Sequence, residues 1–421
     1  MRQTIMKTRT LVLLAALSLS LGQAPAQSVN ITSATRSGLL TWTTPFTNSS
    51  ITLLFSTNLN NRVWLPARHV FSTGLVVSTA LTTPRPPVVF YRVQAQDISN
   101  VPTGMALIPA GAFQMGDNYS QGAATERPVH TVNISGFYMD RFEASNEQIR
   151  QVYQWAYDQG LLGATPATVT NRQGQSYELV DLDLKDHELP VTRLLFTNGL
   201  FSVPVGMANL PITGITWYGA QAYCNYRSDM EGLPRCINFT NWTCDFSQGG
   251  YRLPTEAEWE KGARGGLTGH HFPWASHGGN YLQHITPNQA TFSGSINPYF
   301  NWYMTPGGFF NGQLQLKTAW NWPWVGESLQ TADGVNGYGL YDMAGNAWEW
   351  CWDYWQGDWY SNPAASSDDT RGPVGPVWGR HIRGGGQGYY EDKMRCANRY
   401  NIPWAPEWAS PVVGFRSVRK Q

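Results

Sequence analysis

The chain has 421 residues, and its 29 basic and 29 acidic side chains give a formal net charge of zero. This balance excludes the broad basic surface by which proteins bind nucleic acids or acidic membranes. Only 14% of the residues are charged, whereas 13% are aromatic, with 19 Trp and 42 Gly. Such a composition disfavours a helix bundle and favours a core of loops and short strands, because flat side chains fill space and Gly permits tight turns.

The first 26 residues have the pattern of a signal peptide. Arg2, Lys7 and Arg9 make the start positive, and the apolar run Leu11–Leu21 is too short to span a bilayer comfortably. Small residues at Ala24–Ala26 offer a cleavage site. The sequence therefore predicts a secreted, periplasmic or cell-surface protein with no membrane span after signal removal. An uncleaved membrane anchor is the alternative.

Residues 28–100 are predicted to form a small β-sandwich-like domain. Short apolar or β-branched runs recur at Ser50–Phe55, Val63–Leu65, Leu75–Val77 and Val88–Val93. Turn-forming residues separate these runs, and evenly spaced short strands of this kind are typical of a sandwich. A linker then leads into a second predicted domain, residues 104–421.

Three helices are predicted in the second domain. The first follows Ser145, a suitable N-cap, and the second covers about Trp217–Arg227. The third follows Thr255, which forms a capping-box pattern with Glu258. The remainder of the domain reads as loops and short strands.

The sequence contains no common catalytic or nucleotide-binding motif: no Walker loop, dinucleotide fingerprint, HExxH or GxSxG is present. A histidine cluster is formed by His270, His271, His277 and His284. Its spacing fits no common zinc pattern, so we interpret it as surface polarity rather than as a metal site. Asp353 and Asp358 are considered as an acid/base pair, but ion pairs are the more common role of such residues.

Short sequence blocks follow one another through the second domain in a distinctive order. The most specific are YRLPTEAEWE at Tyr251–Glu260 and NGYGLYDMAGNAWEW at Asn336–Trp350. The others are Ile108–Gly116, Glu126–His130, Phe137–Asn146, Pro211–Trp217, Arg383–Gly386, Arg395–Arg399 and Gly414–Arg416. Together they resemble the formylglycine-generating enzyme, or sulfatase-modifying factor, family. The resemblance implies an irregular α+β fold like that of C-type lectins, with little regular secondary structure.

The family's type enzyme oxidises a sulfatase cysteine to formylglycine with copper and oxygen. It uses a pair of cysteines for this, because copper(I) favours soft thiolate ligands. The corresponding interval of this chain, Gln387–Arg395, contains no cysteine and is shorter, and Gly386 stands where the family usually has Ser. The resemblance thus implies a copper-free protein without cysteine oxidase activity.

Five cysteines are present, and export would permit disulfides. Cys236 and Cys244 are the first candidate pair because they are close in sequence. The resemblance places Cys224 and Cys396 at family disulfide positions whose partners are Ala263 and Ser417 here, so both family bridges look broken. Cys351 is then a candidate partner for Cys396. A copper site built from Cys351 and Cys396 is an alternative that the sequence leaves open.

The block Asp342–Glu349 resembles the family's calcium site. The implied ligands are the side chains of Asp342 and Glu349 and the carbonyl groups of Gly345 and Ala347, since calcium favours hard oxygen donors. The alternative is that the two acidic side chains accept backbone hydrogen bonds or pair with an arginine. A second family calcium site is not expected, because Thr291 stands where the family has Asn.

A groove beside the former cysteine position is predicted to receive an extended peptide, a protein or a glycan. Its candidate lining residues are Trp348, Tyr389, Tyr390 and Glu391, with packing as the alternative role of the two tyrosines. The first functional hypothesis is an exported binding or accessory scaffold. The alternatives are a divergent oxidase or other metal- and oxygen-dependent enzyme acting on a protein or peptide, and a lectin-like carbohydrate-binding protein.

Overall fold

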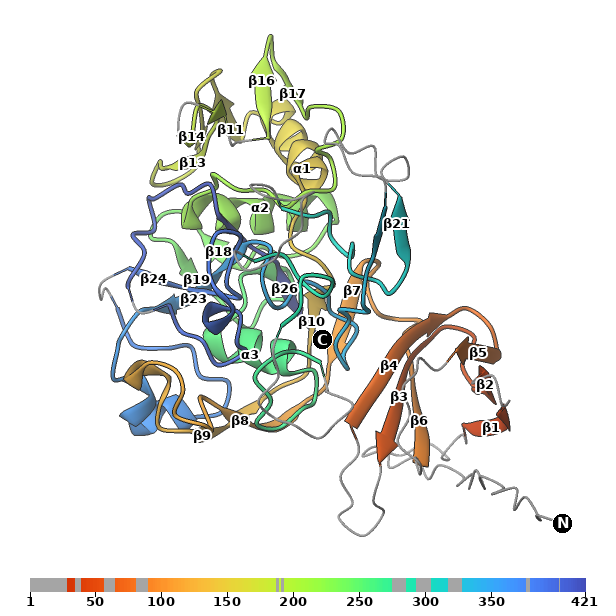
Figure 1. Ribbon diagram of the computed structural model, residues 1–421. Helices are drawn as coiled ribbons and strands as arrows, with labels where there is room; N and C mark the ends of the chain where they lie inside the picture. Colours follow the sequence, from red (N-terminus) through yellow and green to blue (C-terminus); the bar gives the residue numbers. More distant parts are fainter. Residues whose placement is uncertain are drawn as a thin grey trace, which may run out of the picture. The chain divides into compact units, whose positions relative to one another are not determined.

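The computed structural model describes residues 29–34, 39–56, 65–80, 90–186, 189–190, 193–274, 285–292, 304–316, 328–375, 379–400 and 402–421. They divide into two units, with the boundary between Val101 and Pro102 (Figure 1). The predicted signal peptide, residues 1–26, lies outside the described residues. Among those described, no helix has the length and apolar character that crossing a membrane requires.

The first unit consists of two antiparallel sheets. One sheet has the order β1-β2-β5, with bounds Asn30–Ala34, Leu39–Thr43 and Val76–Ala80. The other has the order β4-β3-β6, with bounds Leu65–Ser72, Ser49–Ser56 and Phe90–Asp97. Trp42, Ile51 and Leu53 are fully buried in one core that both sheets contribute to. Ile51 and Leu53 project to the same side of β3 because alternate residues of a strand face the same side of a sheet.

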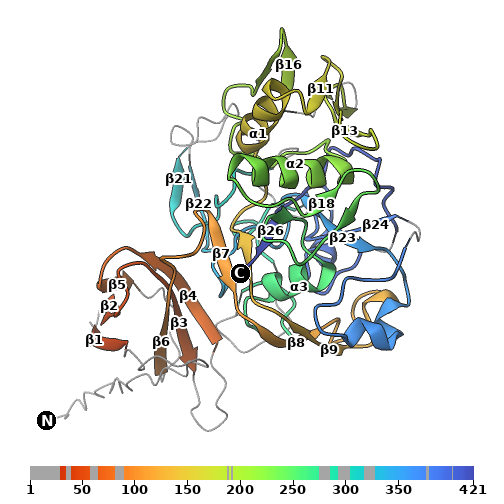
Figure 2. The ribbon, with the colours of Figure 1, turned by 180° about the vertical axis from the view of Figure 1, so that it is seen from behind.

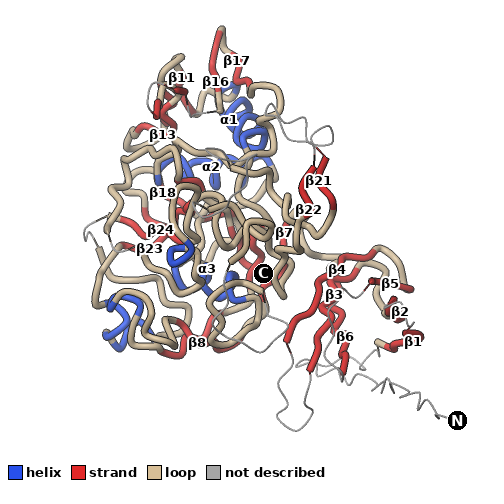
Figure 3. Tube along the Cα trace, viewed as in Figure 1, coloured by secondary structure: helices blue, strands red, loops and turns tan. Residues whose placement is uncertain are grey.

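The second unit is mostly loop, as the tan segments in Figure 3 show. Its α-helices are α1 (Asn146–Asp158), α2 (Trp217–Met230) and α3 (Glu256–Arg264). Its 3-10 turns are Ala124–Glu126, Trp359–Ser361, Pro363–Ser366 and Glu391–Lys393. Its strands are β7 (Met105–Ile108), β8 (Gly111–Met115), β9 (His130–Ile134), β10 (Phe137–Asp140), β11 (Leu162–Ala164), β12 (Thr168–Asn171), β13 (Glu178–Asp181), β14 (Lys185–Asp186), β15 (Leu189–Pro190), β16 (Leu195–Thr197), β17 (Leu200–Ser202), β18 (Ile237–Asn238), β19 (Thr243–Cys244), β20 (Tyr251–Arg252), β21 (Leu314–Leu316), β22 (Ser328–Gln330), β23 (Trp348–Tyr354), β24 (Arg380–Arg383), β25 (Val413–Gly414) and β26 (Val418–Lys420).

The three predicted helices are present, and their predicted start signals are confirmed. The Ser145 side chain accepts a hydrogen bond from the Gln148 backbone N–H, and the Ser145 N–H donates to the Gln148 side-chain oxygen. Thr255 and Glu258 form the same reciprocal box at α3. Helix α3 ends where Gly265 adopts a φ of 55°. Helix α2 runs to Met230, slightly beyond its predicted end.

Two small sheets bring distant segments of the second unit together. The order β20-β26-β10-β7 places the C-terminal strand between β10 and β20, so the C-terminus lies beside β10 (Figure 2). The order β24-β23-β25 pairs β23 in parallel with β25, which directly precedes Phe415 and Arg416. Both pairings place Arg416 between Asp140 and β23. The irregular α+β fold with little regular secondary structure is therefore confirmed.

Candidate functional site

The block Asp342–Glu349 forms a tight turn that leads into β23. Asp342, Gly345 and Asn346 all have positive φ, at 58°, 89° and 69°. A side chain at Gly345 would collide with the Thr291 carbonyl oxygen, so this position requires glycine. The turn buries both acidic side chains of the block, which is the arrangement that the calcium prediction needs.

Glu349 is held in a buried ion pair. The Arg416 guanidinium donates from Nε and Nη2 to its two carboxylate oxygens, at 2.7 Å each. The Trp259 indole N–H donates to the same carboxylate at 2.8 Å. Glu349 and Arg416 have no exposed surface. The structure thus shows the arginine pairing that the sequence left open as the alternative for this residue.

Asp342 lies next to this pair, and within the described part of the chain no Arg or Lys forms an ion pair with it. Its carboxylate accepts the Gly308 backbone N–H at 2.9 Å. Burial raises the pKa of Asp342 to about 6, and the negative charge of Glu349 acts in the same direction.

Glu143, which follows β10, completes the acidic cluster and was not predicted as a site residue. Its carboxylate accepts the Ala347 backbone N–H at 2.9 Å and the Asn346 side-chain amide at 2.6 Å. Burial raises the pKa of Glu143 well above its usual range, and the charges of Asp342 and Glu349 raise it further. The sequence gives little signal for this role, because the block Phe137–Ala144 carries Asp140 and Arg141 as well as Glu143.

Three carboxyl groups, those of Glu143, Asp342 and Glu349, are therefore buried around the single guanidinium of Arg416. Carboxylate and carbonyl oxygens are the ligand type that calcium favours, and a divalent cation would favour the ionised forms of Asp342 and Glu143, but both oxygens of Glu349 already accept from Arg416. Within the described part of the chain, no three His, Cys, Asp or Glu side chains gather closely enough to hold a metal. The predicted set needs only two side chains plus carbonyl groups, so calcium binding stays a prediction.

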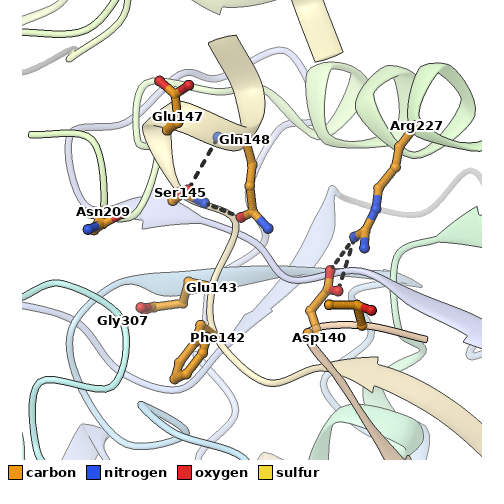
Figure 4. A pocket seen from close by; sticks show the side chains of 11 residues that line it. Asp140, Phe142, Glu143, Ser145, Glu147, Gln148, Asn209, Arg227 and Gly307 are labelled. Atoms are coloured by element: carbon orange, nitrogen blue, oxygen red, sulfur yellow. Dashed lines mark hydrogen bonds and ion pairs between the residues drawn. The ribbon is translucent and has the colours of Figure 1, made fainter. Parts of the chain in front are cut away.

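A pocket of about 340 Å³ opens beside this cluster (Figure 4). Its walls come from the end of β10, the first turn of α1 and the side chain of Arg227 on α2. The lining residues are Thr103, Gly104, Asp140, Phe142, Glu143, Ser145, Glu147, Gln148, Asn209, Arg227 and Gly307. Figure 4 shows Arg227 reaching toward Asp140, whose oxygens lie 2.9 and 3.0 Å from its Nη1 atom. Glu143 is therefore the member of the acidic cluster that lines the pocket.

The four predicted groove residues do not line one open groove. Trp348 has no exposed surface, because the rings of Tyr389 and Tyr400 pack against it at 5.3 and 4.9 Å. A fully buried side chain cannot line an open groove, so the structure does not support this role for Trp348. Tyr389 and Glu391 are half-buried, whereas Tyr390 is 72% exposed.

The comparison with known proteins decides the family. The sequence model of the sulfatase-modifying factor enzyme 1-like domain matches residues 91–421. The chain belongs to this family. The match starts inside β6, so it slightly overlaps the first unit.

Among the relatives, the formylglycine-generating enzyme of Thermomonospora curvata is 29% identical over 328 residues, which are 74% of this chain and 92% of that enzyme. The enzyme of Bos taurus is 29% identical over 336 residues, 75% of this chain and 74% of the enzyme. The serine/threonine-protein kinase Pkn1 of Chlamydia trachomatis is 29% identical over 340 residues, 80% of this chain, but the chain spans only 42% of the kinase. The solved structure of PvdO from Pseudomonas aeruginosa is 22% identical, with a TM-score of 0.48, and covers 75% of this chain and 94% of PvdO.

In this member of the sulfatase-modifying factor family, part of the interval Gln387–Arg395 packs against other side chains. Met394 has no exposed surface and lies in a cluster with Phe272, Phe292 and Ala344. Tyr389 packs against the same cluster. A Cβ on Gly386 would lie 2.7 Å from the Trp348 ring, so the usual family serine does not fit here without a shift.

All five cysteines are free thiols, so neither predicted bridge, Cys236–Cys244 nor Cys351–Cys396, is present. Cys351 and Cys396 share a core cluster and have no exposed surface. Burial raises the pKa of the Cys351 thiol well above its usual range and that of Cys396 to about 12. Both are therefore neutral, inaccessible thiols at physiological pH.

The interpretation of the histidine cluster is corrected by burial. His270 and His271 are only 5% and 7% exposed, so they are not surface residues, and burial lowers the pKa of both. Their predicted companions His277 and His284 lie outside the described residues. Of the two acidic residues Asp353 and Asp358, for which the sequence favoured surface or ion-pair roles, Asp353 is buried and Asp358 is exposed.

Proposed function

We propose that this chain is an exported binding or accessory member of the sulfatase-modifying factor family that does not oxidise cysteine with copper. The observation that carries the proposal is the composition of the interval Gln387–Arg395. It has no cysteine, and the sulfur that it does contain is the buried thioether of Met394. A thioether alone does not replace the thiolate pair that a copper(I) site of this kind requires.

The pair Cys351 and Cys396 does not offer a substitute. Cys351 and Cys396 are buried in the core formed with Trp259 and Leu340, where no substrate can reach them. The thiolate is the metal-binding form, and burial disfavours it at both residues. This supports a loss of the copper chemistry rather than its transfer to new ligands.

The activity test is a conversion assay. We expect the purified chain, given copper, oxygen and a peptide with a sulfatase cysteine motif, to leave the peptide mass unchanged. The formylglycine-generating enzyme of Thermomonospora curvata, under the same conditions, serves as the positive control. Appearance of the formylglycine peptide at a rate set by the concentration of this chain would refute the proposal.

The proposal also includes a structural calcium ion at Asp342, Gly345, Ala347 and Glu349, with Glu143 adding negative charge from the second side. Calcium would supply the positive charge that Arg416 alone does not. The ion would hold the turn before β23 and the end of β10 together, and hence would shape the wall of the pocket at Glu143. The proposed binding function needs only this structural role from the calcium ion and no catalytic one.

We expect calcium to raise the melting temperature of the chain relative to the same sample in a calcium chelator, and to do so more at pH 7.5 than at pH 5. Proton and metal compete for the carboxylates, and the pKa of Asp342 is about 6. The Asp342→Asn variant is expected to lose most of this increment. Equal stabilisation of wild type and variant, or none in either, would contradict the calcium assignment.

A further inference from the structure

The pocket between the end of β10 and the first turn of α1 has the size of a small-ligand site. Its volume of about 340 Å³ lies near the lower end of the range for such sites, roughly 300–1,000 Å³. The charged residues that line it are Asp140, Glu143, Glu147 and Arg227. The ligand that fits therefore depends on which of these charges the protein already neutralises.

Two of the acidic lining residues are paired with arginines. Arg227 donates from Nη1 to the two oxygens of Asp140 at 2.9 and 3.0 Å, and from Nε to Glu231 at 3.2 Å. Arg150 donates to both oxygens of Glu147, at 2.6 and 2.8 Å. Neither Asp140 nor Glu147 therefore contributes an unbalanced negative charge, and Arg227 is already occupied.

Glu143 is different, because no Arg or Lys forms an ion pair with it within the described residues. Its side chain is buried, and its two oxygens each accept one hydrogen bond, from the Ala347 N–H and from the Asn346 side-chain amide. Arg416, whose charge acts on Glu143, donates to Glu349 instead. A carboxylate oxygen has two lone pairs, so both oxygens of Glu143 can accept a further donor.

The first turn of α1 does not offer the anion site that helix N-termini often form. The Asn146 and Glu147 N–H groups donate to backbone carbonyl oxygens at 2.9 and 3.0 Å, and the Gln148 N–H donates to the Ser145 hydroxyl at 3.2 Å. With these donors used, an anion would meet the Glu143 carboxyl without compensation. A cation would find an acceptor there, and the side chain of Phe142 in the same pocket offers apolar surface (Figure 4).

We propose that this pocket binds an alkylammonium group, with the ammonium on the Glu143 carboxylate and the alkyl chain against Phe142. The source of the group is either a lysine side chain of a peptide or a free polyamine. The inference rests on the binding role proposed above and names the chemical class of its ligand. The N–H donors of an ammonium match the acceptor positions that Glu143 retains.

Ammonium binding is expected to tighten as the pH rises from 5 to 8. Burial raises the pKa of Glu143 well above its usual range, and the cation binds the ionised form. Ionisation of Asp342, whose pKa is about 6, adds negative charge over the same range. An alkylammonium stays charged throughout, as lysine does. The ionisable groups around Glu143 are Asp342, Glu349, Arg416, Asp140, Glu147 and Arg227.

The test is calorimetric titration of the full chain with butylammonium and with its neutral analogue n-butanol, in calcium-free buffer. We expect saturable one-site binding of butylammonium, and affinity at least about tenfold lower for n-butanol and for the Glu143→Gln variant, because a charged partner strengthens the hydrogen bond. Asn209→Lys, which adds a positive charge at an exposed lining position, should also weaken binding. Asp358→Asn, at an exposed position outside the lining, should not.

Two further probes distinguish the sources of the ammonium. A tripeptide with a central lysine and both ends blocked represents a peptide, and putrescine represents a free polyamine, so the tighter binder identifies the source. Melting temperatures check that Glu143→Gln folds, since Gln offers Asn346 and Ala347 only one acceptor oxygen. Asn209→Lys repeats the test without changing this contact.

Absence of butylammonium binding would overturn the proposal, as would equal binding of butylammonium and n-butanol. The same holds for unchanged affinity in both Glu143→Gln and Asn209→Lys, or for an affinity that does not increase between pH 5 and 8. None of these results depends on copper or on a sulfatase peptide. The proposed absence of cysteine oxidation would therefore stand or fall separately, by the conversion assay.

Discussion

Replacement of Arg416 by Met is expected to destabilise the chain by about 3–5 kcal/mol, which is the usual cost of removing one partner from a buried ion pair. The substitution leaves the Glu349 carboxylate without a cation and next to two further carboxyl groups, those of Glu143 and Asp342. It also removes guanidinium donation to the Asp140 and Tyr341 carbonyl oxygens. Urea unfolding of the calcium-free chain at pH 7 measures the change.

The matched control is Arg150→Met, which breaks a pair of similar geometry at the protein surface. Arg150 donates to Glu147 at 2.6 and 2.8 Å, but both side chains are about one-third exposed. Exposed pairs contribute about 0–1 kcal/mol because solvent screens them. A similar loss of stability in the two variants would show that the cluster around Glu349 has no special electrostatic role.

Replacement of Asp353 by Asn is expected to change the pH dependence of stability. Asp353 is fully buried and accepts the Glu256 backbone N–H at 2.6 Å. Burial raises the pKa of Asp353 to about 8, and the negative charge of Glu256 contributes. The pKa of Glu256 itself is held at about 2 by Arg399, His381 and Arg383, against the effect of burial.

The raised pKa of Asp353 fixes the sign of the effect. The folded chain keeps a proton on Asp353 that the unfolded chain releases near pH 4, so this group costs stability increasingly as the pH rises from 4 to 8. Asn does not ionise. The stability of Asp353→Asn relative to wild type should therefore increase with pH, by at most about 1.4 kcal/mol per unit, and level off above pH 8.

Asp358→Asn, the same substitution at an exposed position a few residues away, is the control and should show no such trend. Melting temperatures of the three proteins between pH 5 and 9 provide the comparison. A constant difference between Asp353→Asn and wild type over this range would mean that Asp353 is already ionised at pH 5.

The features that sequence predicted well depend on local chemistry. A helix start requires only a cap and a residue three positions later, so Ser145 and Thr255 could be identified without tertiary structure. The ordered blocks identified the family for the same reason, since RLPTEAEWE is one continuous segment of chain. Composition alone indicated the loop-rich core, with Trp259 and Trp350 fully buried in it.

The features that sequence did not predict depend on which distant segments meet. Glu143 joins the buried acidic cluster only because the end of β10 lies beside the turn at Asn346 and Ala347. These residues follow some two hundred positions later in the chain. His271 is buried because the ring of Tyr119 packs against it at 4.9 Å. Trp348 is closed off by Tyr400, which lies beyond the segment considered as a groove. Periodicity and motif spacing carry no signal for such contacts.

The central claim, that this chain cannot assemble the copper centre of its family, is tested most directly by copper(I) titration against a competing chelator. The account predicts no stoichiometric high-affinity copper(I) in the full chain, even when all five thiols are reduced. One tightly held copper(I) per chain, lost when Cys351 or Cys396 is replaced by Ser, would contradict it. Such a result would show that thiols from the core had been brought together as a metal site.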